Sequence, residues 1–126
     1  VCQMWGVFPE VFCPGNEKTF EFWEGVLDEV AELFPGEIIH IGGDECPRDA
    51  WKKCKKCQAR MKQENMKEEG ELQDYTVHRI EAYLKGKGKR VIGWDEILEG
   101  DVSKTAIVMS WRRRVVLKGR REETRW

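Results

Sequence analysis

An adjacent pair of carboxylic acids, Asp44 and Glu45, carries the clearest chemical signal in this 126-residue sequence. The pair ends the segment His40-Ile-Gly-Gly-Asp-Glu, in which a short apolar run leads into two glycines. Side chains alternate between the faces of a regular strand, so both carboxylates reach one pocket only where the strand ends and the backbone bends. Gly42 and Gly43 permit that bend and leave room for a ligand close to the main chain. The segment alone predicts either an acid–base site at a strand end or a solvated pair at a helix N-terminus.

Two tryptophans mark the ends of two further predicted strands. Trp94, followed by Asp95 and Glu96, closes a strand over 90–94, and Trp111 closes a strand over 105–111. One such tryptophan alone is more typical of a core position. Indole rings pack against the C–H faces of sugars while carboxylates accept the sugar hydroxyls. Two indoles at equivalent strand ends, beside an acidic pair, therefore favour a pocket for a polyol, in which acid catalysis is possible.

The elements that position these residues follow an α/β order. A single apolar stripe predicts a helix over about 17–34, with Asn16 as its N-cap and Pro35-Gly36 as its stop. A buried strand over 38–41, a second helix over about 72–86 and the strands at 90–94 and 105–111 follow. The charged, Lys-rich stretch 47–70 is predicted to be a partly helical surface excursion. The stripe consists of Phe20, Trp23, Leu27, Val30 and Phe34, and the second helix turns Leu72, Tyr75, Ile80, Tyr83 and Leu84 inward.

Three strands and two helices are too few to close a (β/α)8 barrel, which takes about 250 residues. The chain is therefore either a small open α/β domain or a piece of something larger. The sequence begins without Met, so we expect its true start to lie upstream.

Composition and charge narrow the classes of partner. An apolar share of 40% and a charged share of 36% are typical of a globular protein, and no apolar run approaches the roughly 20 residues that span a bilayer. Residues 112–126 contain seven basic and two acidic side chains, which leaves residues 1–111 acidic. A region as acidic as residues 1–111 binds nucleic acid poorly. The basic residues 112–126 are expected to be a solvated or disordered end. Neither nucleic acid nor a membrane is an expected partner.

The cysteines form an odd set of five, which does not favour a disulfide framework. Cys54-Lys-Lys-Cys57 together with Cys46 offers three thiolates, with His40 or His78 as the nearest fourth ligand. A structural zinc site normally shows two tightly spaced pairs of ligands, and only one pair occurs here. The sequence therefore predicts ordinary thiols, with no metal and no cofactor. The set comprises Cys2, Cys13, Cys46, Cys54 and Cys57.

Three motifs in register resemble the β-N-acetylhexosaminidases of glycoside hydrolase family 20. His40-Ile-Gly-Gly-Asp-Glu45 is similar to the hallmark H-x-G-G-D-E of that family, and Val91-Ile-Gly-Trp-Asp-Glu96 and Val108-Met-Ser-Trp111 resemble its next two barrel strands. The likeness covers about residues 5–112. It implies that residues 1–111 form the central part of a catalytic (β/α)8 TIM barrel, about strands 4–6, followed by a disordered or aberrant tail over 112–126.

The resemblance also implies a reaction. Family members remove terminal β-linked N-acetylglucosamine or N-acetylgalactosamine from glycans or glycoconjugates by a retaining mechanism in which the substrate assists. Glu45 matches the general acid/base, a role that requires a pKa raised by partial burial and by the acidic neighbour. Asp44 matches the carboxylate that orients the 2-acetamido group, whose carbonyl oxygen acts as the nucleophile.

Five further residues receive substrate-binding roles from the resemblance. Trp94 and Trp111 match indoles that wall the sugar pocket, and His40 matches a residue that supports the acidic pair. Asp95 and Glu96 face a neighbouring sugar or cap the following turn.

Other parts of the family's site have no counterpart here. An Arg that grips the sugar, and a later Asp, Tyr and Trp, match no position of this chain, so the alternative is a non-catalytic carbohydrate-binding or degenerate barrel piece. Bacterial members often act outside the cytoplasm, which suggests a periplasmic or secreted location, although the unpaired cysteines give that location no support.

Overall fold

The computed structural model describes residue 6 and residues 8–111, which form one α/β unit. Its elements follow the order expected from the sequence. The stretch predicted to be partly helical contains two short helices between β1 and α4, and a 3-10 helix that was not predicted follows β2. The tail at 112–126 lies outside the described residues. In chain order the elements are α1 (Glu17–Leu33), β1 (Ile38–His40), α2 (Asp49–Lys53), α3 (Lys55–Gln63), α4 (Gly70–Gly86), β2 (Arg90–Trp94), the 3-10 helix η1 (Asp95–Glu99) and β3 (Ile107–Met109).

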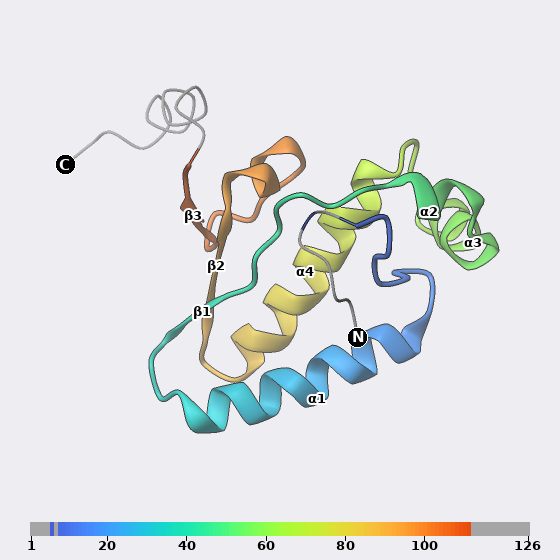
Figure 1. The fold of residues 1–126 in the computed structure, drawn as a ribbon. Coiled ribbons are helices and arrows are strands. Elements are labelled where there is room, and N and C mark those ends of the chain that lie inside the picture. Colours follow the sequence, from blue (N-terminus) through green and yellow to red (C-terminus); the bar gives the residue numbers. More distant parts are fainter. Residues whose placement is uncertain (1–5, 7, 112–126) are drawn as a thin grey trace.

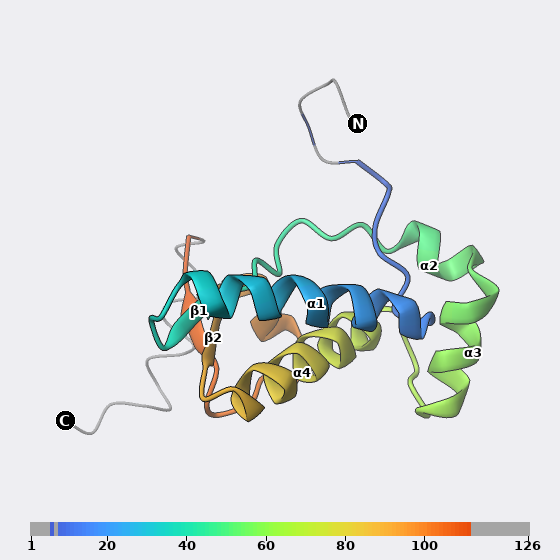
Figure 2. The same cartoon turned by 90° about the horizontal axis from the view of Figure 1, so that it is seen from below.

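The three strands form one parallel sheet in the order β1-β2-β3. Ile39 of β1 lies opposite Val91 of β2, and Trp94 of β2 lies opposite Met109 of β3. Helices α1 and α4 pack on the same face of the sheet, as Figures 1 and 2 show together. β3 is shorter than the predicted strand over 105–111, because its pairing with β2 ends at Met109.

The main core lies between the sheet and these two helices. It contains Leu27 from α1, Leu84 from α4, and Ile39 and Val91 from the sheet. α1 begins where predicted, since the Asn16 side chain accepts a hydrogen bond from the Lys18 N–H. The last residue of the predicted stripe, Phe34, is 64% exposed, because the helix ends before it.

A second core lies under α2 and α3, in the stretch predicted as a surface excursion. Trp51, Cys57 and Met61 are buried there against Leu72 of α4. The stretch is helical, as predicted, and most of its Lys and Glu side chains are exposed. Its apolar side is nevertheless a packed layer, which fixes the chain that follows Glu45.

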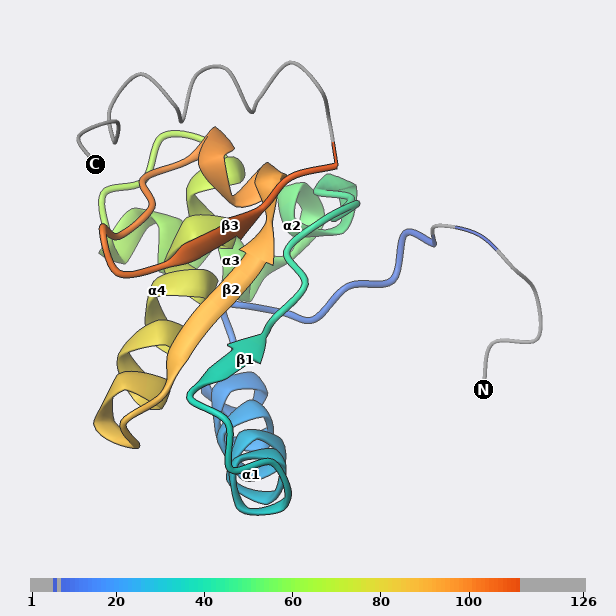
Figure 3. The same cartoon turned by 90° about the vertical axis from the view of Figure 1, so that its left-hand side faces the viewer.

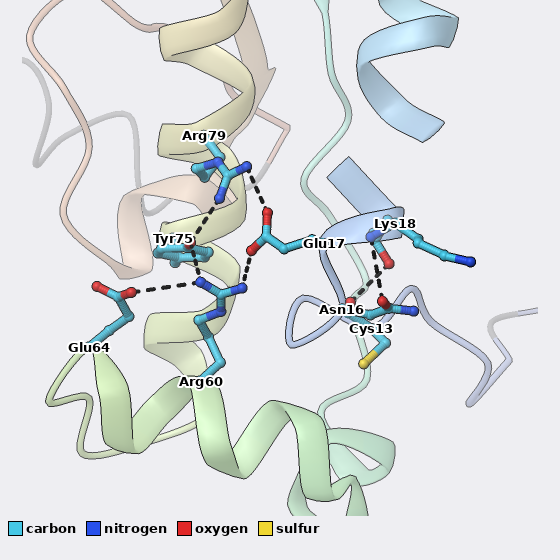
Figure 4. Close-up of polar contacts among 9 residues, drawn as sticks. Cys13, Asn16, Glu17, Lys18, Arg60, Glu64, Tyr75 and Arg79 are labelled. Carbon is cyan, nitrogen blue, oxygen red and sulfur yellow. Dashed lines mark hydrogen bonds and ion pairs between the residues drawn. The ribbon is translucent and has the colours of Figure 1, made fainter. Parts of the chain in front are cut away.

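One carboxylate links three helices. Glu17, at the start of α1, accepts hydrogen bonds from Arg60 of α3 and from Arg79 of α4, the latter at 3.2 Å. Both guanidinium groups also donate to the Tyr75 hydroxyl at 3.0 Å (Figure 4). The hydrogen bond from Arg79 is the main cause that lowers the pKa of Glu17 below its usual range.

The other face of the sheet carries Ile38, His40, Trp94 and Met109, and no helix among the described residues covers it (Figure 3). Ile38 is 51% exposed and Met109 is 41% exposed. A parallel sheet with helices on one face only matches the wall of a (β/α)8 barrel, in which the bare face lines the interior. No helix in the described part of the chain is long and apolar enough to cross a membrane.

Candidate functional site

The Asp44-Glu45 pair lies directly after a glycine turn at the C-terminal edge of the sheet. The chain runs beside β2 beyond β1, because Ile41 N–H donates to the Ile92 carbonyl at 2.9 Å and Trp94 N–H donates to the Gly42 carbonyl at 2.8 Å. Gly42 and Gly43 then take φ values of 74° and 95°. A Cβ atom at Gly43 would lie 2.6 Å from the Ile97 side chain. The expected bend is present, and it requires glycine for conformation and for space.

Glu45 continues the turn with a φ of 44°, a left-handed conformation that few residues with a side chain adopt. Its side chain is exposed, so the partial burial implied by the family resemblance does not occur within the described chain. Glu45 lines a hollow of about 540 Å³ together with Arg48, Glu96 and Trp111. The hollow has a size typical of small-ligand sites.

Asp44 is half-buried and lines a different hollow, of about 520 Å³. Its wall is mostly apolar and comes from the loop before α1, from α1, β1 and α4, and His40 also contributes. Gln73 and Cys46 border both hollows. The two carboxylates are therefore adjacent in sequence but line separate spaces in the chain as described, because the left-handed residue turns the backbone between them.

Gln73 of α4 positions this turn, and the sequence did not single it out. Its buried side-chain amide donates to the Gly43 carbonyl at 2.9 Å, and its oxygen accepts from Arg48 at 3.1 Å. Arg48 in turn forms an ion pair with Glu99 at 3.4 Å. The available signal was a polar residue between Leu72 and Val77 on the inward face of a predicted helix.

His40 lies beside the pair, at the end of β1. Its Nδ1 accepts a 3.0 Å hydrogen bond from the Gly42 N–H. That acceptor role places the ring proton of a neutral imidazole on Nε2. The ring also meets Trp94 edge to face, with 4.9 Å between centroids. His40 and Trp94 thus lie together, and His40 contacts the glycine turn rather than the carboxylates.

Asp95, Glu96 and Trp111 join the ends of β2 and β3. Asp95 is fully buried, and the Ser110 hydroxyl donates to its carboxylate at 2.8 Å. The Trp111 indole N–H lies 3.1 Å from both carboxylate oxygens of Glu96. Glu96 and Trp111 therefore share the hollow of Glu45, whereas the burial of Asp95 favours a role in holding the strand ends together.

The cysteines that lie together are not the three that the sequence offered as possible ligands. Sγ of Cys13 lies 3.5 Å from Sγ of both Cys54 and Cys57, whereas Cys46 does not belong to this group. Burial raises the pKa of Cys46, and burial is also the main cause that raises the pKa of Cys57 to about 12. The two histidines considered as ligands lie elsewhere, since His78 contacts the Asp101 carbonyl. Sequence reasoning missed Cys13, whose one local signal is the Cys-Pro-Gly turn.

The chain is similar to known proteins over most of its length. Residues 1–124 match the family model described as "Glycosyl hydrolase family 20, catalytic domain", so the match continues into the segment expected to be an aberrant tail. A β-hexosaminidase of Porphyromonas gingivalis is 54% identical over 109 residues, which cover 86% of this chain and 14% of that protein. A β-hexosaminidase of Vibrio furnissii is 44% identical over 102 residues, which cover 80% of this chain and 17% of that protein.

Solved structures agree in fold. The exo-β-N-acetylglucosaminidase of Vibrio harveyi, in complex with N-acetylglucosamine, matches this chain with a TM-score of 0.83 and 38% identity. The matched part covers 89% of this chain and 18% of the Vibrio harveyi chain. The chitobiase of Flavobacterium johnsoniae has a TM-score of 0.79 at 44% identity and covers 85% of this chain and 16% of that one. The chain spans less than a fifth of the length of each of these relatives.

Proposed function

This chain belongs to glycoside hydrolase family 20, and we propose that it supplies the acid–base part of a site that removes terminal β-linked N-acetylhexosamine from glycans. The observation that carries the proposal is the turn Gly42-Gly43-Asp44-Glu45, at the strand edge where (β/α)8 barrels keep their active sites. Relatives named β-hexosaminidase, and one solved in complex with N-acetylglucosamine, support this substrate class.

The proposed reaction is retaining and uses the substrate as its own nucleophile. Glu45 donates its proton to the glycosidic oxygen while the carbonyl oxygen of the 2-acetamido group attacks the anomeric carbon. The C–O bond to the leaving group breaks, and an oxazolinium intermediate forms. Asp44 accepts a hydrogen bond from the acetamido N–H and stabilises the positive charge of this intermediate. Glu45 then takes a proton from water, whose oxygen bonds to the anomeric carbon. The bond from that carbon to the acetamido oxygen breaks, and the β-configuration is restored.

The aromatic residues complete the proposed pocket. Trp111 borders the hollow of Glu45, and its hydrogen bond to Glu96 fixes the plane of the indole against the sugar. Trp94, with His40 against it, lies on the bare face of the sheet, which becomes the pocket floor when the barrel is closed. In this proposal the three strands correspond to about strands 4–6 of the barrel.

A chimera tests the proposal, because the site needs a closed barrel. Residues 8–111 replace the matching segment of the Porphyromonas gingivalis β-hexosaminidase, and hydrolysis of 4-nitrophenyl N-acetyl-β-glucosaminide is measured. We expect the chimera to turn over, and Glu45→Gln to lower kcat by about 10²–10⁴-fold. Glu21→Gln, which changes an exposed glutamate on α1, serves as the matched control.

Two results separate the alternatives. Unchanged turnover in the Glu45→Gln chimera would remove Glu45 from the acid/base role. A folded chimera that binds N-acetylglucosamine without turnover would favour the alternative, a carbohydrate-binding piece of a degenerate barrel.

A further inference from the structure

Three sulfur atoms meet where the loop before α1 packs on the first turn of α3. Sγ of Cys13 lies 3.5 Å from Sγ of Cys54 and 3.5 Å from Sγ of Cys57. In the described part of the chain, these three thiols are the group whose ligand atoms all lie within 4.8 Å of one another. Cys13 is separated by more than 40 residues from the Cys54-Lys-Lys-Cys57 turn, so the cluster is a tertiary contact.

The loop that carries Cys13 is tightly fixed against this turn. A Cβ atom at Gly15 would lie 2.2 Å from the Lys56 carbonyl and 2.4 Å from the Cys57 nitrogen, so only glycine allows the two backbones to approach. Pro14 is fully buried. The Cys13 carbonyl accepts from the Thr19 hydroxyl at 2.9 Å. It also accepts from the Asn16 N–H at 3.0 Å (Figure 4). The sulfur positions therefore follow from packed backbone.

Main-chain N–H groups act on two of the sulfurs. Those of Cys57 and Lys56 lower the pKa of Cys54, and that of Gly15 lowers the pKa of Cys57 against the larger, raising effect of burial. Such N–H donors stabilise sulfur in its anionic form, which is the form that binds metal ions. Burial of Cys57 does not prevent this, because a divalent cation displaces the thiol proton outright.

The distances distinguish a metal site from a disulfide. A disulfide requires about 2.05 Å between two sulfurs, and it would leave the third thiol unused. Tetrahedral zinc, with Zn–S bonds of about 2.3 Å, places its sulfur ligands about 3.8 Å apart. Both observed sulfur–sulfur separations, of 3.5 Å, are close to that distance. A single central ion would bind all three sulfurs.

We propose that Cys13, Cys54 and Cys57 bind one Zn²⁺ ion as thiolates. Three thiols lose their protons to solvent as three Zn–S bonds form, and the fourth position takes a water molecule, since Sγ of Cys46 lies outside the group. The ion ties the Cys13-Pro-Gly loop to the segment that follows Glu45. That segment already contacts the same loop through Trp51, whose indole N–H donates to the Phe12 carbonyl at 2.9 Å. The site does not depend on the proposed function.

Metal analysis of the full 126-residue chain, purified under reducing conditions after growth with added zinc, tests the proposal. We expect about one zinc per chain, and X-ray absorption to give Zn–S distances of about 2.3 Å with three sulfurs. X-ray absorption can be measured on precipitated protein, so association of the chain does not prevent this measurement. Replacing zinc by Co²⁺ should produce a thiolate-to-metal charge-transfer band.

Variants assign the ligands. Cys13→Ser and Cys57→Ser should each weaken zinc binding by about 10–100-fold or more. Cys46→Ser is the matched control and should retain zinc, because Cys46 lies on the same core but outside the group of three. The proposal would be overturned if the reduced protein contained no zinc, or if a disulfide joined Cys13 to Cys54 or to Cys57. It would also be overturned if Cys46→Ser lost as much zinc as the ligand variants.

Discussion

The Gln73 side-chain amide donates a 2.9 Å hydrogen bond to the carbonyl of Gly43, the residue that precedes Asp44. Gln73 belongs to α4, thirty residues along the chain, and its oxygen also accepts from Arg48. The glycine turn is thus held by a helix that also packs in the main core through Leu84. Gln73 therefore connects the packing of α4 to the position of the acidic pair.

Gln73→Met should misplace the turn, because methionine fills a similar volume without donating to the Gly43 carbonyl. An unsatisfied buried carbonyl costs about 1–3 kcal/mol. In the barrel chimera we expect a corresponding loss of stability in urea unfolding, together with a kcat reduced by about 10-fold. Gln63→Met, at an exposed position at the end of α3, is the control. Equal effects of the two substitutions would show that the hydrogen bond does not position the site.

Glu96→Ala should act through Trp111, since the indole N–H donates to Glu96. We expect Glu96→Ala to raise the KM of the chimera several-fold, because the indole loses its fixed plane. In a Trp111→Phe background, which has no N–H group, the same substitution should change KM little. The test is a double-mutant cycle with the nitrophenyl substrate. Additive effects would mean that Glu96 contacts the substrate directly.

Glu17→Gln should destabilise the chain at neutral pH, because it removes the negative charge that Arg79 and Arg60 share. A half-exposed ion pair contributes up to about 1 kcal/mol. The pKa of Glu17 is lowered from 4.5, so its contribution is complete above about pH 4.5 and is lost as the pH falls through the folded-state value.

Urea unfolding of wild type and Glu17→Gln at pH 7 and pH 3 measures this effect, with Glu21→Gln as the control. The stability difference between wild type and Glu17→Gln should shrink at the lower pH. A difference of the same size at both values would contradict the assignment.

The isolated chain should show little hydrolysis and should self-associate. The bare sheet face exposes Ile38 and Met109, and the outer edges of β1 and β3 have no neighbouring strand among the described residues. Met109→Lys should lower the apparent mass at a given concentration in analytical ultracentrifugation, whereas Ala82→Lys on α4 should not. A monomeric wild-type chain with robust turnover would contradict this prediction.

Local patterns in the sequence determined most of the secondary structure. The apolar stripe from Phe20 to Val30, the Asn16 cap and the short apolar runs at 38–41 and 90–94 predicted α1, β1 and β2 with small boundary errors. Gly42-Gly43 predicted the bend before Asp44, and the three strand-end motifs indicated the family. These inferences succeed because periodicity, capping and glycine conformation act over a few neighbouring residues.

Only the tertiary structure decided which distant residues meet. No local pattern indicates that Cys13 meets Cys54 and Cys57, or that Gln73 meets Gly43, because those contacts depend on how α3 and α4 pack against the loops. The left-handed conformation of Glu45, which separates its hollow from that of Asp44, also follows from the packed surroundings of the turn. The spacing of apolar residues along the sequence indicates which face of a helix or strand is buried. The free energy of packing the whole molecule decides what that face touches.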